Sequence, residues 1–248
     1  MGIVLTDAAA VSGTGTPLSS LIASIAGILQ DSAYTDLVIT GKINAVILKI
    51  AGGIRMPNGE TSPPLPDLYA YGTVNTSITL PYVSLPTNYQ RKASKVYDSS
   101  NNQIAPPRGG DYYAFSKFMQ QINDFSLAET GSIYRVCIKG SRVYYQGIPS
   151  ASTTLGLHYY RKPATLALDG DIPEGIPEHL QEDLIKHGVL KDVFGEKIED
   201  GQDNAGIGTK YHTGKFFEAM TALCDFVGID GEPQYYGEDG FEDGGVCD

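Results

Sequence analysis

Cysteine is scarce in this chain of 248 residues, and its three copies lie far apart, at Cys137, Cys224 and Cys247. None of them belongs to a Cys-x-x-Cys pair, so the spacing excludes the usual zinc-binding signatures. An odd number of cysteines also argues against a disulfide framework and favours a reducing compartment. A chain of this length can bury about 70–75% of its unfolded surface, so its core needs no covalent or metal support.

Long hydrophobic runs are missing as well. The most apolar stretch, Leu21–Leu29, is far shorter than the roughly 20 residues needed to cross a bilayer. The N-terminus has no basic segment of the kind that begins a signal peptide. With 42% hydrophobic and 19% charged residues, the composition is that of an ordinary globular protein. We therefore expect a soluble, unsecreted protein that does not bind membranes.

Positive charge is sparse, because 18 Lys and Arg stand against 29 Asp and Glu, for a formal net charge of −11. Arg91, Lys92 and Lys95 are the only local group of basic residues. A protein that grips nucleic acid usually carries a basic patch, so tight DNA binding is not expected. This charge is compatible with a surface that DNA slides past without being held.

Signatures of catalysis and cofactor binding are also missing. Gly208–Lys215 resembles a phosphate-binding loop, but Thr209 stands where such a loop needs its first glycine and Phe216 where it needs a hydroxyl. The chain has no Gly-x-Ser-x-Gly nucleophile motif. We therefore expect no cofactor and no enzymatic activity. The two carboxylates of a glycan hydrolase can lie far apart in the sequence and come together only in the folded protein. A glycan hydrolase is therefore kept as a hypothesis, behind the two that are given at the end of this section.

Metal-binding patterns are no better supported. His179 and His187 lack the His-Glu-x-x-His spacing of a zinc-protease helix. Asp169–Asp171 and Glu199–Asn204 offer oxygen ligands, but they lack the spacing and the closing glutamate of a calcium loop. We expect ordinary histidines, solvated acidic turns and no bound metal.

Helical periodicity marks both ends of the chain. Residues 17–30 and 35–53 predict one pair of helices, and residues 177–194 and 211–227 predict another, with Gly195 as a C-cap. Neither pair can bury its apolar stripe alone, so we expect the two pairs to pack together. The predicted core positions of the last three helices are Leu37, Ile39, Ile43, Ile47, Ile50, Ile54, Leu180, Leu184, Ile185, Phe194, Phe216, Met220, Leu223, Cys224 and Val227.

The middle of the chain predicts short strands between turns, for example at 77–83, 93–97, 133–138, 142–145 and 154–160. In the last of these, Leu155, Leu157 and Tyr159 alternate with Gly156, His158 and Tyr160, which is the period of a strand. A tight hairpin turn is expected at 139–141 and a short helix at 111–123. The fold class is therefore α+β, with a four-helix bundle-like domain and an inserted β-rich domain of sandwich or barrel type.

These patterns divide the chain into five segments. Residues 1–16 form a flexible N-terminal arm, 17–68 and 169–228 the two parts of the helical domain, 69–168 the inserted β-rich domain, and 229–248 an acidic C-terminal tail. The tail contains no Lys or Arg, and its acidic residues are interleaved with Tyr235, Tyr236 and Phe241. This mixture favours a peptide that becomes ordered on a partner over a merely solubilising tail, and these three residues are the predicted docking residues.

Tyrosine is abundant, with 16 copies, and most of them fall in or beside the β-rich segment. They could fill a core and pair strands, or they could form an interface, and the sequence favours neither reading. The tyrosines concerned are Tyr69, Tyr71, Tyr82, Tyr89, Tyr97, Tyr112, Tyr113, Tyr134, Tyr144, Tyr145, Tyr159 and Tyr160.

The passage from strand to helix, "YYRKPATL" followed by "GIPEHLQEDLIKHGVLKDVFG", resembles the corresponding joint of tailed-phage head-to-tail adaptor (connector) proteins. The order of the elements is similar too, from two N-terminal helices through "TSITLPYVSLPTNYQRKASKVYD" and "DYYAFSKFM" to two C-terminal helices. The resemblance covers most of the chain, although the glycine-rich first helical pair and the acidic tail depart from the pattern.

This resemblance implies a structural virion protein that forms a ring, a dodecamer matching the portal. The ring would lie beneath the portal in the neck of the particle and line the channel through which DNA passes without specific binding. Its partners would be other copies of itself, the portal protein and a downstream tail or nozzle protein, assembled in the host cytoplasm. The alternative is a tail-associated collar, nozzle or receptor-contacting module, which the tyrosine-rich middle would serve equally well.

Overall fold

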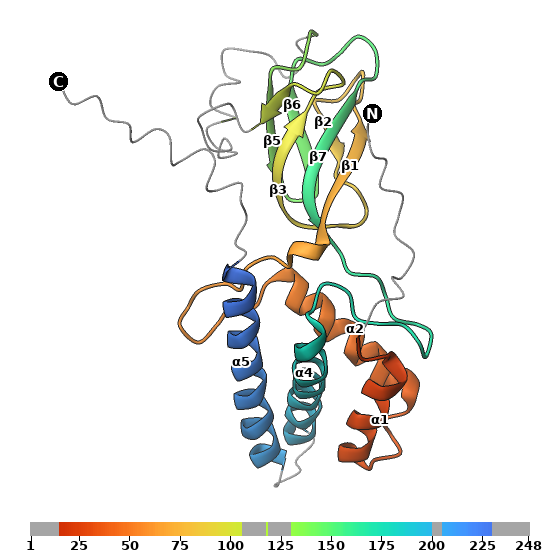
Figure 1. The fold of residues 1–248 in the computed structure, drawn as a ribbon. Helices are drawn as coiled ribbons and strands as arrows, with labels where there is room; N and C mark the ends of the chain where they lie inside the picture. The colour runs from red at the N-terminus through yellow and green to blue at the C-terminus, as the bar shows by residue number, and fades with distance from the viewer. Residues whose placement is uncertain (1–14, 106–117, 119–129, 200–204, 230–248) are drawn as a thin grey trace, which may run out of the picture. The chain divides into compact units, whose positions relative to one another are not determined.

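The computed structural model of the chain describes residues 15–105, 118, 130–199 and 205–229, and Figure 1 shows its elements. The described residues form two compact units. The helical unit combines residues up to Leu68 with those from Lys162 onward, and the β unit comprises Tyr69 to Arg161. The helical unit holds four long helices in its described part, and the β unit holds antiparallel sheets. The α+β class predicted from the sequence is therefore confirmed.

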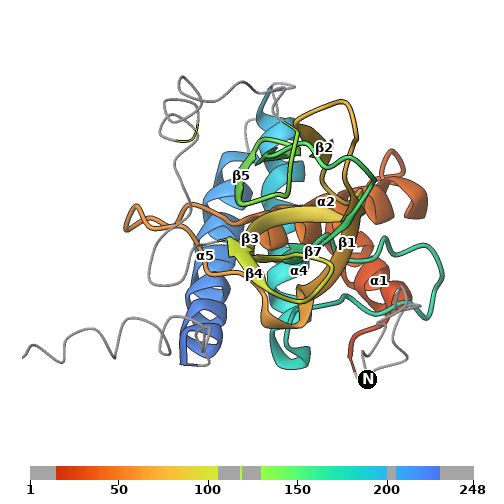
Figure 2. The same ribbon diagram turned by 90° about the horizontal axis from the view of Figure 1, so that it is seen from above.

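Helix α4 is the centre of the helical unit. The four helices are α1 (Leu18–Leu29), α2 (Asp36–Gly52), α4 (Glu178–Glu199) and α5 (Ala205–Ile229). Helix α4 contacts each of the other three, and its contact with α5 is the most extensive. Figures 1 and 2 show α4 between α5 and α1. The helices from the two ends of the chain therefore share one core.

Gly188 lies where α4 is closest to its neighbours. A β-carbon at this position would lie 2.7 Å from Cγ1 of Val46 in α2 and 3.1 Å from the ring of Phe216 in α5. Both neighbours are buried, so neither has room to move away. Any residue larger than glycine here would push α2 and α5 away from α4.

Two helix boundaries differ from the sequence prediction. Helix α4 continues through Gly195, the predicted C-cap, and ends at Glu199. Helix α5 begins at Ala205, before the predicted start at residue 211, and so includes Gly206 and Gly208. Glycine costs a helix about 1 kcal/mol relative to alanine, and the long α4–α5 contact offsets that cost.

Most of the predicted helical core positions are buried, but four are not. Leu37 is 83% exposed, and Ile54 lies beyond the end of α2. Phe194 and Cys224 are only half-buried. The burial of Ile39, Ile43, Val46, Ile47 and Ile50 shows that the buried face of α2 excludes the position of Leu37.

The β unit contains two antiparallel sheets, ordered β1-β7-β3-β4 and β2-β6-β5. The short helix η1 (Pro66–Leu68) leads into the first strand. The two sheets bury side chains in one common cluster, to which Val96 and Leu157 of the first sheet and Val143 and Tyr145 of the second contribute. The strands are β1 (Tyr69–Asn75), β2 (Tyr82–Ser84), β3 (Tyr89–Tyr97), β4 (Gln103–Ala105), β5 (Arg135–Lys139), β6 (Arg142–Gln146) and β7 (Thr154–Arg161).

The predicted alternation in β7 is confirmed, because Leu155, Leu157 and Tyr159 are all buried in this cluster. The hairpin turn is confirmed too, since Lys139 pairs with Arg142. The strand predicted at 77–83 is wrong for most of its length, and only Tyr82–Ser84 is extended. The hydroxyl of Ser77 accepts hydrogen bonds from the backbone N–H groups of the second and third residues after it, which makes a turn instead.

The predicted short helix at 111–123 lies outside the described residues except for Phe118, which is buried.

We predict that Gly188→Ala destabilises the protein by about 1–3 kcal/mol, because the added methyl group overpacks the contact of α4 with α2 and α5. Gly195→Ala is the matched control in the same helix, since a β-carbon there meets nothing within 4 Å. The control should be neutral or stabilising by up to about 1 kcal/mol. Urea unfolding measures both, and equal stability of the two variants would contradict the packing described here.

Candidate interaction surfaces

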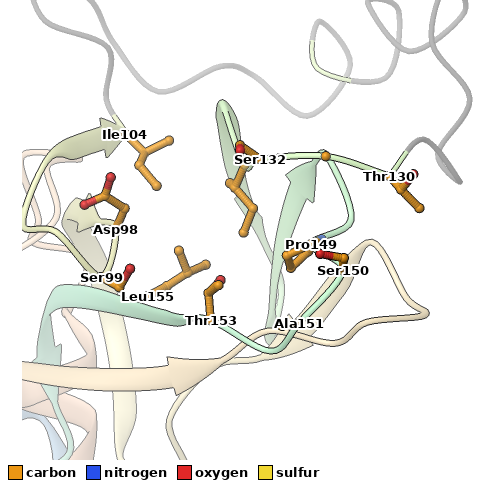
Figure 3. A pocket seen from close by; sticks show the side chains of 12 residues that line it. Asp98, Ser99, Ile104, Thr130, Ser132, Pro149, Ser150, Ala151, Thr153 and Leu155 are labelled. Carbon is orange, nitrogen blue, oxygen red and sulfur yellow. The ribbon is translucent and has the colours of Figure 1, made fainter.

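The β unit has a cavity of about 520 Å³ between the turn that follows β3 and the loop that precedes β7 (Figure 3). Serine and threonine hydroxyls line most of its polar wall, and Asp98 is the only carboxylate among its described lining residues. The carboxylate of Asp98 accepts hydrogen bonds from the backbone N–H groups of Asn102 and Ser100, each 2.8 Å long, and from Nδ2 of Asn102. These bonds, chiefly the one from the Asn102 backbone, lower its pKa. A single ionised carboxylate held by its own turn does not form the pair that glycoside hydrolysis requires.

Two of the histidines hydrogen-bond to each other inside the helical unit. His187 of α4 and His212 of α5 are buried, and their Nδ1 atoms lie 2.8 Å apart. One ring donates its N–H and the other accepts, and the ring of Phe194 stacks on His212 with centroids 5.4 Å apart. Burial lowers the pKa of both rings, and nearby positive charge at Lys186 lowers it further. The pair therefore joins two helices in its neutral form.

Two other candidate sites from the sequence, Gly208–Lys215 and Asp169–Asp171, are parts of a helix and of a turn. Gly208–Lys215 lies inside α5, so its backbone N–H groups belong to a helix and not to a phosphate-binding loop. The carboxylate of Asp171 accepts hydrogen bonds from the backbone N–H groups of Ala167 and Leu168, which lower its pKa and close a turn. Residues 200–204 lie outside the described part of the chain. Within that described part, no group of three or more His, Cys, Asp or Glu side chains is placed to hold a metal.

The tyrosines divide between the core and the surface. Tyr145 is fully buried, and its hydroxyl accepts a hydrogen bond from the N–H of Ser77 and donates one to the carbonyl of Leu80, each 2.8 Å long. Tyr69 and Tyr71, by contrast, are 36% and 42% exposed. Tyr112 and Tyr113 lie outside the described residues. The core-filling reading is therefore confirmed for Tyr145, and the interface reading stays a prediction for the exposed tyrosines.

Tyr69 and Tyr71 lie on the side of the first sheet that faces away from the shared core, next to Tyr160, which is only 3% exposed. Residues that pair across antiparallel strands point to the same side, so the outward side of β7 can be followed across to β1 and β3. Three rows of residues pair across β1, β7 and β3 on this side. They are Tyr69–Tyr160–Arg91, Tyr71–His158–Lys95 and Thr73–Gly156–Tyr97. We call these nine residues the tyrosine face. It contains four tyrosines, one histidine and two basic residues, and no carboxylate.

His158 is the centre of the tyrosine face. The ring centroids of Tyr71, Tyr69 and Tyr97 lie 5.1, 5.5 and 5.5 Å from its own. The ring of Tyr71 also covers Gly156, where a β-carbon would collide with it. Burial, together with the charge of Lys95, lowers the pKa of His158, so this ring is neutral near pH 7. Arg91 and Lys95 therefore supply the positive charge of the face.

The helical unit has exposed apolar surface on α2 and on α5. On α2, Leu37 and Leu48 are 83% and 42% exposed, with the small residues Gly41 and Ala45 exposed between them. The two lysines of α2 form ion pairs with Glu196 and Asp192 of α4, with N–O distances of 2.7 and 2.6 Å, and so do not interrupt this stripe. On α5, the exposed apolar side chains are Ile207, Tyr211 and Phe226. Exposed apolar surface of this kind marks interaction sites.

Two features of the sequence bear on these surfaces. Tyr235, Tyr236 and Phe241, the predicted docking residues, lie outside the described residues. Sequence reasoning also missed the charge of the β unit, because the net charge of the whole chain conceals it. Residues 69–161 contain nine Lys and Arg but only four Asp and Glu, a formal charge of +5, so the rest of the chain carries −16. Counting charge by segment would have shown this.

A family model for the SU10 adaptor protein matches residues 16–237, which is most of the chain. The chain therefore belongs to this family of phage head-to-tail adaptors, and the resemblance predicted from the sequence is confirmed. Membership makes it a structural protein of the phage particle that interacts with head and tail components. No curated protein matches the chain. Among the described helices, none combines the length and the apolar character needed to cross a membrane.

We predict that the free energy of unfolding falls as the pH drops below about 6.5, because His187 and His212 bind protons more readily in the unfolded chain than in the folded one. Their contribution is fully present above that pH and is lost in acid. Thermal unfolding between pH 8 and 5.5 should show Tm falling by several degrees.

The variant His212→Gln should flatten this pH dependence. The control His179→Gln should not, because His179 is an exposed side chain against Phe226. A wild-type Tm that is constant over this range would show that the pair does not titrate as described.

Proposed function

We propose that the protein is a head-to-tail adaptor that forms a ring beneath the portal, joins the capsid to the tail and surrounds the channel through which DNA passes. The family match over residues 16–237 is the observation that carries this proposal. The two apolar sides of the helical unit support it. A cyclic ring needs two different complementary faces on each subunit, and α2 and α5 offer such a pair.

In this proposal the two units have different tasks. The helices form a bundle-like domain that packs against neighbouring copies and the portal, and the β unit forms a sandwich-like domain that meets the downstream tail or nozzle protein. Twelve copies match the portal, and assembly takes place in the host cytoplasm. The acidic tail, through Tyr235, Tyr236 and Phe241, docks on a partner. The formal charge of −11 on each copy favours a channel that does not bind DNA specifically.

The second candidate is a tail-associated collar, nozzle or receptor-contacting module. Two features of the β unit favour it, the hydroxyl-lined cavity and the tyrosine face, since both are surfaces on which a partner or a glycan could bind. A module of this kind would bind a tail component or a host surface and would ignore the portal.

We predict that the purified chain adds to the portal assembly from the same genome as a full set of subunits. Mass photometry of the chain alone, of the portal alone and of the mixture measures the stoichiometry. A portal species that gains the mass of twelve copies supports the adaptor, whereas a portal mass that does not change would favour the tail module.

We predict that Leu37→Asn lowers incorporation into the portal complex by about tenfold or more, because it places a polar side chain in the apolar stripe of α2. Leu37 is too exposed for the substitution to affect the core. Leu168→Asn is the matched control, since Leu168 is 71% exposed but lies outside the helices. If both variants lost incorporation to the same degree, or if both kept it, the result would show that α2 is not part of the interface.

A further inference from the structure

Strand β1 is an open edge of the first sheet. It is the first strand in the order β1-β7-β3-β4 (Figure 1), so only one of its two edges pairs with a neighbouring strand. The backbone N–H of Thr76 donates to the carbonyl of Thr153, 2.8 Å away, which continues the ladder of β1 with β7. Hydrogen-bonded and non-hydrogen-bonded pairs alternate in an antiparallel ladder. The backbone groups of Tyr71, Thr73 and Asn75, all three exposed residues, therefore point away from β7.

Strand β1 also lacks the features that keep sheet edges from pairing with other chains. Edge strands are usually very short, charged, or interrupted by a bulge or a proline. The other three edge strands among the described residues fit this rule, since β2 and β4 have three residues each and β5 carries Arg135 and Lys139 at its ends. Strand β1 has seven residues, no charge and no proline, and its register with β7 is unbroken from Tyr69 to Asn75. It is therefore suited to accept an added strand.

The N-terminal segment of the chain has the composition of such a strand. Ile3, Val4 and Thr6 are β-branched, and no charged side chain occurs before Asp7. β-Branched residues are the ones that favour extended, paired backbone. The C-terminal segment, in contrast, is rich in glycine and in acidic residues. Of the two terminal segments, only the N-terminal one therefore has the chemistry to extend a sheet.

We infer that residues 2–6 of a neighbouring copy of this chain add to the open edge of β1 as a further strand. The backbone N–H and C=O groups of that segment would pair with the outward groups of Tyr71, Thr73 and Asn75. This inference rests on the proposed ring, because it assigns one of the contacts between neighbouring subunits.

The segment is anchored at its base and long enough to reach another copy. The backbone N–H of Thr16 donates to Oε1 of Gln181, 2.8 Å away. Gln181 is buried and is itself held by hydrogen bonds to two backbone carbonyls. The eight residues that link the pairing segment to Gly15, residues 7–14, extend to about 26 Å. This exceeds the roughly 14 Å across the four strands of the first sheet.

A neighbouring copy is a better donor of this strand than the same chain is. The donor segment and the edge are two different patches, so each copy gives one strand and receives one, and head-to-tail contacts of this type close a ring. In this structure of a single chain, the outward backbone groups of Tyr71, Thr73 and Asn75 make no hydrogen bond to a described residue. An open edge is the state expected when the strand that covers it belongs to another copy.

Photo-cross-linking of rings made from two isotope forms tests the inference. Rings would be assembled on the portal from equal amounts of ¹⁵N-labelled and unlabelled chain carrying Asn75→p-benzoylphenylalanine. Irradiation should join position 75 to residues 2–6, with heavy peptides linked to light ones. The matched control is Lys139→p-benzoylphenylalanine, at the end of the edge strand β5, which should give no link to the segment.

Hydrogen exchange gives a second, independent measurement. Assembly of the wild-type ring should slow exchange in the peptide from Tyr69 to Asn75 by about three amides, which are the outward N–H groups of β1. Val4→Pro should abolish this protection, because proline has no N–H and cannot extend a ladder. Val11→Pro, in the linker, is the matched control and should keep the protection. Equal protection in the two variants would overturn the inference.

Two further results would also overturn the inference. Links that join only heavy to heavy and light to light peptides would place the segment on its own subunit. Links from position 75 to the portal alone would assign the edge to the portal. In each case, a full set of subunits on the portal in mass photometry would leave the adaptor function standing. A portal that gains no subunits would instead contradict the adaptor function, and the inference with it.

Discussion

The close packing of α4 against the other three helices is the constraint on which the rest of the structure depends. Helices α1 and α2 precede the β unit in the chain, and α4 and α5 follow it, so the contacts of α4 with α1 and α2 help to join the two ends of the chain into one body. Gly188 sets the distance of that contact, and the neutral pair of His187 and His212 joins α4 to α5. The partly exposed ion pairs between α2 and α4 contribute little by comparison, because solvent screens them.

This arrangement leaves exposed side chains on each of the two units. Within the described helices, the two most exposed large apolar side chains are Leu37 on α2 and Ile207 on α5. In the β unit, the shared core uses one side of the sheet β1-β7-β3-β4, and the other side carries the tyrosine face. The helical surfaces are apolar and suit tight packing, whereas the tyrosine face is aromatic and contains Arg91 and Lys95.

Hydrophobic periodicity predicted the elements that bury one side along most of their length. The alternation through Leu155, Leu157 and Tyr159 was enough to define β7 and its buried side, and the stripe from Ile39 to Ile50 defined α2. Sequence patterns failed where a contact with a residue far away in the chain sets the end of an element. Gly195 is a good stop signal by local chemistry, but α4 runs past it because α5 packs along its length.

The candidate surfaces were harder to predict for the same reason. A tyrosine at a β position does not reveal whether its side chain points into the core, as Tyr145 does, or outward, as Tyr71 does, until the register with the neighbouring strands is known. The Nδ1 contact of His187 with His212 joins residues on two different helices, and no local pattern marks it. The positive charge of the β unit was present in the sequence but was concealed by averaging over the chain.

Electron cryomicroscopy of the neck of the phage particle is the measurement that decides whether this protein is the adaptor. The proposal predicts density for a ring of this chain directly beneath the portal, with neighbouring copies in contact through the helical units and a channel that contains DNA. A particle in which the chain is found at the tail tip or on the fibres, with another protein beneath the portal, would contradict it.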